Sequence, residues 1–277
     1  MGRNEEKIKY AYFPGCASKQ LTSEYDKATR LACKELGIEL VDIPEFSCCG
    51  AGVVKEVDSK FNEDMNERNF NCSKDKGLDI MTICSTCVIN LRKDLFKQRE
   101  KGKFTDFNVK HWLWVLTEDL GIEKLRAAVK KPLKGLKIAT YYGCHILRPS
   151  KYVKDHQNTA NPFNFEEFVE ALGATPVDLP SKLDCCGFHI SMSNKKASTH
   201  MSDKYLRDAS EGEADLIITN CPFCHMQFDM YQKTTNIPIL HMSQVLCLAL
   251  GIDSRELCFK KHLKSDPIFK GPLSKFI

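Results

Sequence analysis

The chain has 277 residues, 43% of them hydrophobic and 27% charged, which excludes a disordered or fibrous protein and, at roughly 100–200 residues per domain, favours two domains. Its 40 basic and 36 acidic residues nearly balance, so the charge does not indicate nucleic acid as a partner. No apolar run is long enough to span a membrane, and residues 1–7 lack the apolar core of a signal peptide. We therefore expect a cytoplasmic protein without a membrane span.

Short apolar runs alternate with amphipathic stretches along both halves of the chain. In the first half, we expect strands at Ile8–Phe13, Glu39–Ile43 and Leu78–Ile83, and helices at Thr22–Leu36, about Val57–Lys74 and Cys84–Lys101. In the second half, we expect strands at Leu136–Tyr142, Ala174–Leu179 and Asp215–Thr219, and helices at Phe163–Leu172 and Lys195–Ala209. The alternation predicts an α/β fold in which each half has a small, mostly parallel sheet flanked by helices.

The two halves are repeats of one another. The segments that align, in the same order, are Lys9–Cys16 with Lys137–Cys144, Cys48-Cys49-Gly50 with Cys185-Cys186-Gly187, and Cys84-Ser-Thr-Cys87 with Cys221-Pro-Phe-Cys224. In both halves the Cys-x-x-Cys motif begins 35 positions after the second cysteine of the pair. Matches in one order indicate two tandem duplicated domains. We place them at residues 1–131 and 132–277.

Cysteine is the unusual residue of this chain, with 14 copies. Because disulfides are rare in a reducing cytosol, this number indicates metal or redox chemistry. Ten of the cysteines form a set of five in each half: Cys16, Cys48, Cys49, Cys84 and Cys87, then Cys144, Cys185, Cys186, Cys221 and Cys224. A structural zinc ion takes four ligands and would leave one thiol of each set unused. Adjacent cysteines suit a multi-iron cluster, in which neighbouring thiolates reach different irons, so two iron–sulfur clusters are predicted.

These motifs resemble the CCG domains in the B subunit of heterodisulfide reductase over nearly the whole chain, with the second half most similar through Tyr142–His145, Asn220–Asp229 and His241–Leu246. The resemblance implies two noncubane [4Fe–4S] clusters, each held by the five cysteines of one half. It implies an enzyme, the catalytic subunit that cleaves or forms a disulfide by one-electron steps. The implied substrate is a disulfide like that of coenzyme M with coenzyme B, if the protein is methanogenic. A ferredoxin-like iron–sulfur subunit and a flavin-containing subunit are the implied partners.

One segment departs from the family. Phe188–Ser191 stands where the family has several glycines, and its bulky side chains would narrow a cavity there. The substrate therefore stays open. One alternative is the B subunit of a heterodisulfide reductase-like sulfur-oxidation complex, which acts on sulfane or protein-bound sulfur. The others are a pure electron-transfer subunit and a zinc-stabilised scaffold.

His145 directly follows Cys144 and is the candidate catalytic residue. Its ordinary pKa of about 6.5 suits a proton donor to a leaving thiolate, and the alternative is that it only hydrogen-bonds a cluster sulfur. His111 and His241 match across the repeat and are interpreted as helix-start or packing residues. His225 is interpreted as a donor beside its cluster, and His189 as a residue that could line the cavity.

The remaining residues of interest receive structural interpretations. We interpret as buried or otherwise structural the four cysteines outside the repeat: Cys33, Cys72, Cys247 and Cys258. We interpret as a solvated helix face the basic residues Arg92, Lys93, Lys97 and Arg99. Trp112 and Trp114 are expected to pack inside their own domain rather than to line a partner interface.

Overall fold

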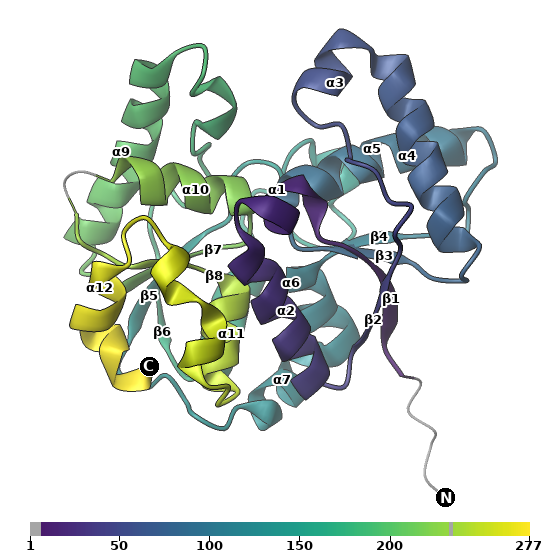
Figure 1. The fold of residues 1–277 in the computed structure, drawn as a ribbon. Helices are drawn as coiled ribbons and strands as arrows, with labels where there is room; N and C mark the ends of the chain where they lie inside the picture. The colour runs from purple at the N-terminus through teal and green to yellow at the C-terminus, as the bar shows by residue number, and fades with distance from the viewer. Residues whose placement is uncertain (1–6, 233–234) are drawn as a thin grey trace, which may run out of the picture.

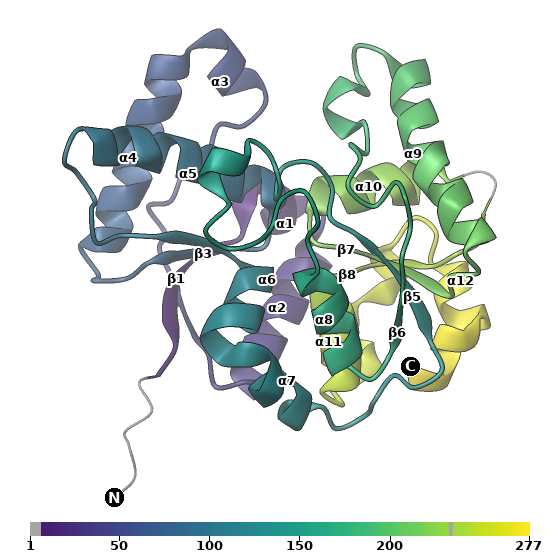
Figure 2. The ribbon, with the colours of Figure 1, turned by 180° about the vertical axis from the view of Figure 1, so that it is seen from behind.

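The computed structural model describes residues 7–232 and 235–277. Two four-stranded sheets lie beside each other, with helices between and outside them (Figures 1 and 2). Each strand pairs in parallel with its neighbours, so the predicted α/β fold with a parallel sheet in each half is confirmed. Residues 1–6, which supply most of the segment behind the expected cytoplasmic location, lie outside the described residues.

The first sheet has the strand order β2-β1-β3-β4. Its strands are β1 (Lys9–Phe13), β2 (Glu39–Asp42), β3 (Ile80–Thr82) and β4 (Val109–His111). The helices of this half are α1 (Gly15–Gln20), α2 (Ser23–Glu35), α3 (Val53–Val57), α4 (Ser59–Lys74), α5 (Ser85–Glu100), α6 (Trp112–Trp114), the π-helical η1 (Val115–Gly121) and α7 (Ile122–Ala128).

The second sheet repeats this arrangement in the order β6-β5-β7-β8. Its strands are β5 (Lys137–Tyr141), β6 (Thr175–Val177), β7 (Leu216–Thr219) and β8 (Ile239–His241). The longer helices are α8 (Asn164–Ala171), α9 (Lys195–Glu211), α10 (Pro222–Tyr231), α11 (Met242–Ala249) and α12 (Asp266–Lys270). The short 3₁₀ turns are η2 (Ser150–Tyr152), η3 (Phe188–Ile190), η4 (Ser254–Leu257), η5 (Phe259–Lys261) and η6 (Pro272–Phe276).

All the strands and helices expected from the sequence are present, with ends that differ by a few residues. Each sheet also has a fourth strand, β4 or β8, that the sequence did not predict. Both are three residues long; β3 and β6 are equally short but lie inside the longer expected segments Leu78–Ile83 and Ala174–Leu179. The domain boundary between residues 131 and 132 stays a prediction.

The two halves exchange helices across their interface. The segment after β4, made of α6, η1 and α7, packs against α8 of the second half, and α11, which follows β8, packs against α2 of the first half. Figure 1 shows α2 and α11 side by side between the two sheets. The hydroxyls of Thr29 on α2 and Ser243 on α11 share a buried hydrogen bond of 2.7 Å, and the Cys247 thiol donates to the carbonyl of Ala28 at 3.1 Å. The buried apolar residues of both halves form one continuous core.

Arg92 corrects one expectation. Its side chain is fully buried instead of lying on a solvated face. The guanidinium of Arg92 donates to Asp155 at 2.8 Å and to the carbonyl of Val109 at 2.9 Å, and it also bonds the carbonyl of Tyr152. Asp155 and Tyr152 belong to the second half, so Arg92 joins the two halves. The expectation for the two tryptophans holds only in part. Trp112 and Trp114 are both fully buried, but the Trp114 ring stacks on His156 of the second half, with ring centroids 4.2 Å apart, so it does not pack inside its own domain.

Within residues 7–232 and 235–277, none of the helices combines the length and apolar character that crossing a bilayer requires.

Candidate metal centre

The repeated cysteines lie at the carboxyl ends of the strands, where open α/β sheets bind their ligands. In the first half, Cys16 lies on α1 directly after β1, the Cys48-Cys49 pair lies in the loop after β2, and Cys84 is the N-cap of α5. The second half repeats this placement after β5, β6 and β7, with Cys221 as the N-cap of α10. Each cysteine motif of both halves thus follows a strand.

The five thiols of each half contact one another as a set. In the first half, Cys49 Sγ lies 3.5 Å from Cys87 Sγ. Neighbouring sulfurs of this half shift one another's pKa in the order Cys16, Cys48, Cys49, Cys87 and Cys84. In the second half they do so in the order Cys144, Cys185, Cys186, Cys224 and Cys221. A tetrahedral zinc site would leave one thiol of each set unused. Here all five thiols of each set take part.

Glycines bring the backbone close to these sulfurs. Gly15, with a φ of +80°, would place an added Cβ 3.0 Å from Cys87 Sγ, and Gly143, with a φ of +68°, would place one 3.0 Å from Cys224 Sγ. Only glycine adopts such a backbone conformation without strain and leaves this space open. The glycine after each cysteine pair also donates its N–H to the first sulfur of that pair. Gly50 donates to Cys48 Sγ at 3.3 Å, and Gly187 donates to Cys185 Sγ at 3.4 Å.

The electrostatics of the two sets are alike. Hydrogen bonds from Cys16 and Cys49 lower the pKa of the Cys48 thiol to about 2, and those from Cys144 and Cys186 lower the pKa of the Cys185 thiol to about 2. The resulting thiolate raises the pKa of its neighbours, that of Cys49 to about 12. Five thiols cannot all ionise so close together unless positive charge lies among them, and iron ions provide that charge. The donor set therefore fits an iron–sulfur cluster in each half.

The two sets meet at the interface between the halves. Cys84 Sγ lies 4.0 Å from Cys221 Sγ, and both side chains are buried. The Ser85 hydroxyl, next to Cys84, donates to Asn220 Oδ1 at 2.9 Å. The N-terminal ends of α5 and α10 thus face each other. No sequence pattern indicates this contact, because it joins residues 137 positions apart.

A small pocket opens on the second set, and residues of both halves line it. From the first half come Ser85 and Thr86; from the second come Cys144, His145, Cys185, Cys186, Phe188, His189, Cys221, Phe223 and Cys224. The rings of Phe188 and Phe223 stack with centroids 4.5 Å apart. The expectations that Phe188 narrows the cavity and that His189 lines it agree with this arrangement.

His145 is held in the pocket by the other half of the chain. Its Nδ1 lies 2.9 Å from the Thr86 hydroxyl, and Thr86 Oγ1 also lies 3.8 Å from Cys221 Sγ. Burial lowers the pKa of His145, and the neighbouring His189 lowers it further. Thr86 is a site residue that the sequence analysis missed, although its position inside the Cys84-Ser-Thr-Cys87 motif was a usable signal.

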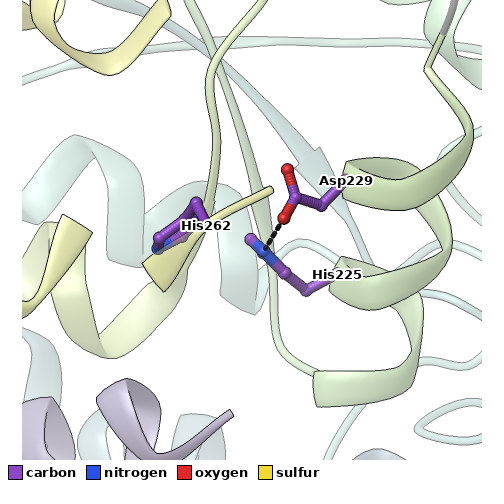
Figure 3. A group of neighbouring side chains, drawn as sticks. All are labelled: His225, Asp229 and His262. Carbon is purple, nitrogen blue, oxygen red and sulfur yellow. Dashed lines mark ion pairs between the residues drawn. The ribbon is translucent and has the colours of Figure 1, made fainter. Parts of the chain in front are cut away.

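The other histidines are explained by packing and helix capping. His111 and His241 cap α6 and α11 through their Nδ1 atoms, so the helix-start interpretation is confirmed. His225 faces Asp229 and His262 (Figure 3), with its Nε2 3.8 Å from the Asp229 carboxylate. Asp229 also accepts backbone N–H bonds from the segment after His262. His225 thus belongs to a buried group that holds the C-terminal segment against α10, whereas the sequence predicted a donor beside the cluster.

Comparison with known proteins assigns the fold to a family. Residues 10–92 and 138–229 each match the model of the CCG cysteine-rich domain. The chain belongs to the CCG family. The two matched stretches include β1 to β3 and β5 to β7 almost completely and end before β4 and β8, and the resemblance found in the sequence is confirmed.

Three relatives match almost end to end. The chain is 36% identical to the 8-methylmenaquinol:fumarate reductase membrane anchor subunit of Wolinella succinogenes, over 90% of this chain and 94% of that protein. It is 35% identical to the B subunit of the ferredoxin/F420H2-dependent CoB-CoM heterodisulfide reductase of Methanosarcina acetivorans, over 92% and 93% of the two chains. It is 31% identical to a protein of Archaeoglobus profundus named for its likeness to the B subunit of heterodisulfide reductase, over 90% and 93%.

A solved structure shares the fold. The crystal structure of a hypothetical protein from Helicobacter pylori superposes with a TM-score of 0.70 at 15% identity. The match covers 94% of this chain but only 52% of that one. Together with the thiol sets, the relatives identify the chain as a heterodisulfide reductase B-like iron–sulfur subunit with a redox role.

Proposed function

We propose that this chain is the catalytic subunit of a heterodisulfide reductase-type complex. It holds two noncubane [4Fe–4S] clusters, one on Cys16, Cys48, Cys49, Cys84 and Cys87 and the other on Cys144, Cys185, Cys186, Cys221 and Cys224. The observation that carries the proposal is the contact of the two five-thiol sets at Cys84 and Cys221, 4.0 Å apart. Two redox centres that meet suit a disulfide, whose reductive cleavage leaves two sulfurs that each take one electron.

The clusters, when bound, supply the electrons and a site for sulfur; the protein supplies position and protons. The pocket over the second set offers His145 to a substrate sulfur, and Thr86 fixes the orientation of its ring. We propose that His145 gives a proton to the leaving thiolate. Replacing His145 with Gln should slow disulfide reduction while the iron content stays unchanged. Unchanged turnover would remove His145 from the mechanism.

Thr86 has its own test. Thr86→Val removes one hydrogen bond to His145, which at a net ~0.5–1.5 kcal/mol should slow turnover by about 2- to 12-fold. Thr86→Ser retains the hydroxyl and should restore the rate. The opposite pattern, a full rate in Thr86→Val and a loss in Thr86→Ser, would mean that the methyl group, through packing, is what the site needs.

Metal content tests the cofactor proposal directly. Anaerobically prepared protein should contain about eight irons and eight acid-labile sulfides per chain and almost no zinc. Cys186→Ala should lower the iron content to about half, because the groups that act on the Cys186 thiol, Cys185, Cys224, Cys221 and the backbone of Phe188, all lie in the second half. About two zinc ions per chain in the native protein would support a zinc-stabilised scaffold instead.

We also propose that electrons arrive from partner proteins, a ferredoxin-like iron–sulfur subunit that is itself supplied by a flavin-containing one. Activity of the isolated chain with an artificial reductant and a disulfide separates a catalytic role from a pure electron-transfer role. Activity with a sulfane or protein-bound sulfur substrate but not with a coenzyme M–coenzyme B disulfide would favour the sulfur-oxidation complex.

One observation favours a second candidate function, the oxidation of a quinol. The stacked rings of Phe188 and Phe223 make one wall of the pocket aromatic, and a flat aromatic ligand stacks well on such a wall. A relative at 36% identity carries methylmenaquinol in its name. Oxidation of a naphthoquinol by the holoprotein with an artificial electron acceptor, and no reduction of a disulfide, would decide for this function.

A further inference from the structure

The two histidines that cap the exchanged helices occupy equivalent positions. His111 ends β4 and His241 ends β8, and in each sheet the histidine pairs in register with the threonine two residues before the first cysteine of its own Cys-x-x-Cys motif, Thr82 or Thr219. By strand pairing alone, each histidine would therefore be tied to the cysteines of its own half.

The imidazoles have one defined tautomer. Nδ1 of His111 accepts the Leu113 N–H at 3.1 Å, and Nδ1 of His241 accepts the Ser243 N–H at 3.3 Å. A nitrogen that accepts carries no proton, so in the neutral ring Nε2 is the donor. Both side chains are fully buried, and burial lowers the pKa of His111 to about 4 and that of His241 to about 3, which makes both rings neutral at physiological pH.

The Nε2–H of each ring donates to a carbonyl in the opposite half. Nε2 of His111 lies 2.9 Å from the carbonyl oxygen of Asn220, and Nε2 of His241 lies 3.4 Å from that of Ile83. Asn220 directly precedes Cys221, and Ile83 directly precedes Cys84. Each acceptor is thus the peptide that leads into the first cysteine of the other half's motif.

We infer that His111 and His241 are a reciprocal pair of positioning residues, each of which fixes a cysteine ligand of the opposite cluster. The inference rests on the proposed function, in which both sets carry clusters. Its consequence is that the distance between Cys84 and Cys221 is set by two crossed hydrogen bonds, each starting at the N-cap of an exchanged helix. The two sites therefore form one unit, although each half supplies a complete set of thiols.

The inference predicts that a substitution in one half alters the cluster of the other. His→Asn at either position keeps a side chain that caps helices well but does not reach the opposite carbonyl. Two backgrounds that each retain a single cluster make the effect assignable: Cys186→Ala retains the first-half cluster and Cys49→Ala retains the second-half cluster.

In the Cys49→Ala background, His111→Asn should change the EPR spectrum of the remaining second-half cluster and speed its loss of iron to a chelator about fivefold, the equivalent of one ordinary hydrogen bond. His241→Asn is the matched control and should do less. In the Cys186→Ala background the roles reverse, with a smaller effect because the His241 bond is the longer one. His→Ser at the same position, another helix-capping residue, provides a second variant if Asn does not fold.

The outcomes separate the two proposals. An effect confined to the cluster of the histidine's own half would overturn the inference and leave the proposed function standing. Equal effects of both histidines on both clusters would also overturn it, because that is what general packing damage produces. Absence of iron from the parent protein would overturn the proposed function itself.

Discussion

Arg92 gives a quantitative test of how the two halves hold together. Its guanidinium is fully buried and bonds the carbonyls of Val109 and Tyr152 together with the Asp155 carboxylate. Arg92→Met retains most of the apolar stem but removes every one of these bonds. The two buried carbonyls then lack a donor, at ~1–3 kcal/mol each, whereas Asp155 is half exposed and regains water.

The expected loss is about 3 kcal/mol, because removing the buried charge also removes part of its desolvation penalty. An unfolding entropy of about 2.1 cal/mol/K per residue gives roughly 0.6 kcal/mol/K for a chain of this size, so the midpoint of thermal unfolding should fall by about 5 °C. Anaerobic thermal unfolding followed by circular dichroism measures it. Lys93→Met, at the next position of α5 and partly exposed, is the control and should shift the midpoint by less than about 1 °C. Equal shifts in the two variants would refute the idea that Arg92 joins the halves.

Two further predictions concern the glycine beside a thiol set and the acid stability of the fold. Gly15→Ala should lower the iron content of the first half, because its Cβ would lie 3.0 Å from Cys87 Sγ; Gly37→Ala, with a φ of +70° and open space around it, should retain full iron, and an equal iron loss would point to backbone strain instead. Because burial lowers the pKa of His111 to about 4 and of His241 to about 3, the unfolded chain takes up protons first as the pH falls below about 6.5, and stability present above that pH is lost, by ~1.4 kcal/mol per histidine at pH 5.5. The drop in the midpoint of thermal unfolding between pH 7.5 and pH 5.5 should therefore be about 5 °C smaller in the double His→Asn variant than in the parent. An equal drop in both proteins would contradict the lowered pKa of these histidines.

The sequence predicted the parts of this fold that depend on local patterns. Apolar runs such as Leu136–Tyr142 and amphipathic stretches such as Lys195–Ala209 carry their own periodicity, so these elements were found. The strands β4 and β8 were missed because their formation depends on pairing with a neighbouring strand and not on a local pattern. Arg92 was misassigned for a similar reason: a charged residue beside Lys93 looks solvated until a partner from the other half covers it.

The thiol sets were predictable because a ligand set must be encoded by residue type and spacing, and duplication showed each set twice. Which residues contact across the repeat was not encoded in that way. The bonds of Thr86 with His145, and of His111 with the peptide before Cys221, join residues 59 and 109 positions apart. Only packing of the two halves brings these residues together.

The exchange of helices offers a physical reason why duplication produced one working unit. Two independent domains on a linker would leave the distance between their thiol sets free to vary, and the proposed electron transfer and disulfide cleavage both depend on that distance. Here the helical segment after the fourth strand of each sheet packs on the other half, its N-cap histidine reaches the opposite cysteine motif, and the core is continuous. Separating the two thiol sets therefore requires breaking buried contacts on both sides at once. If the chain is split between residues 131 and 132, each fragment should accordingly bind iron only when the two are co-expressed. Binding of iron by each fragment expressed alone would show that the exchanged helices are dispensable.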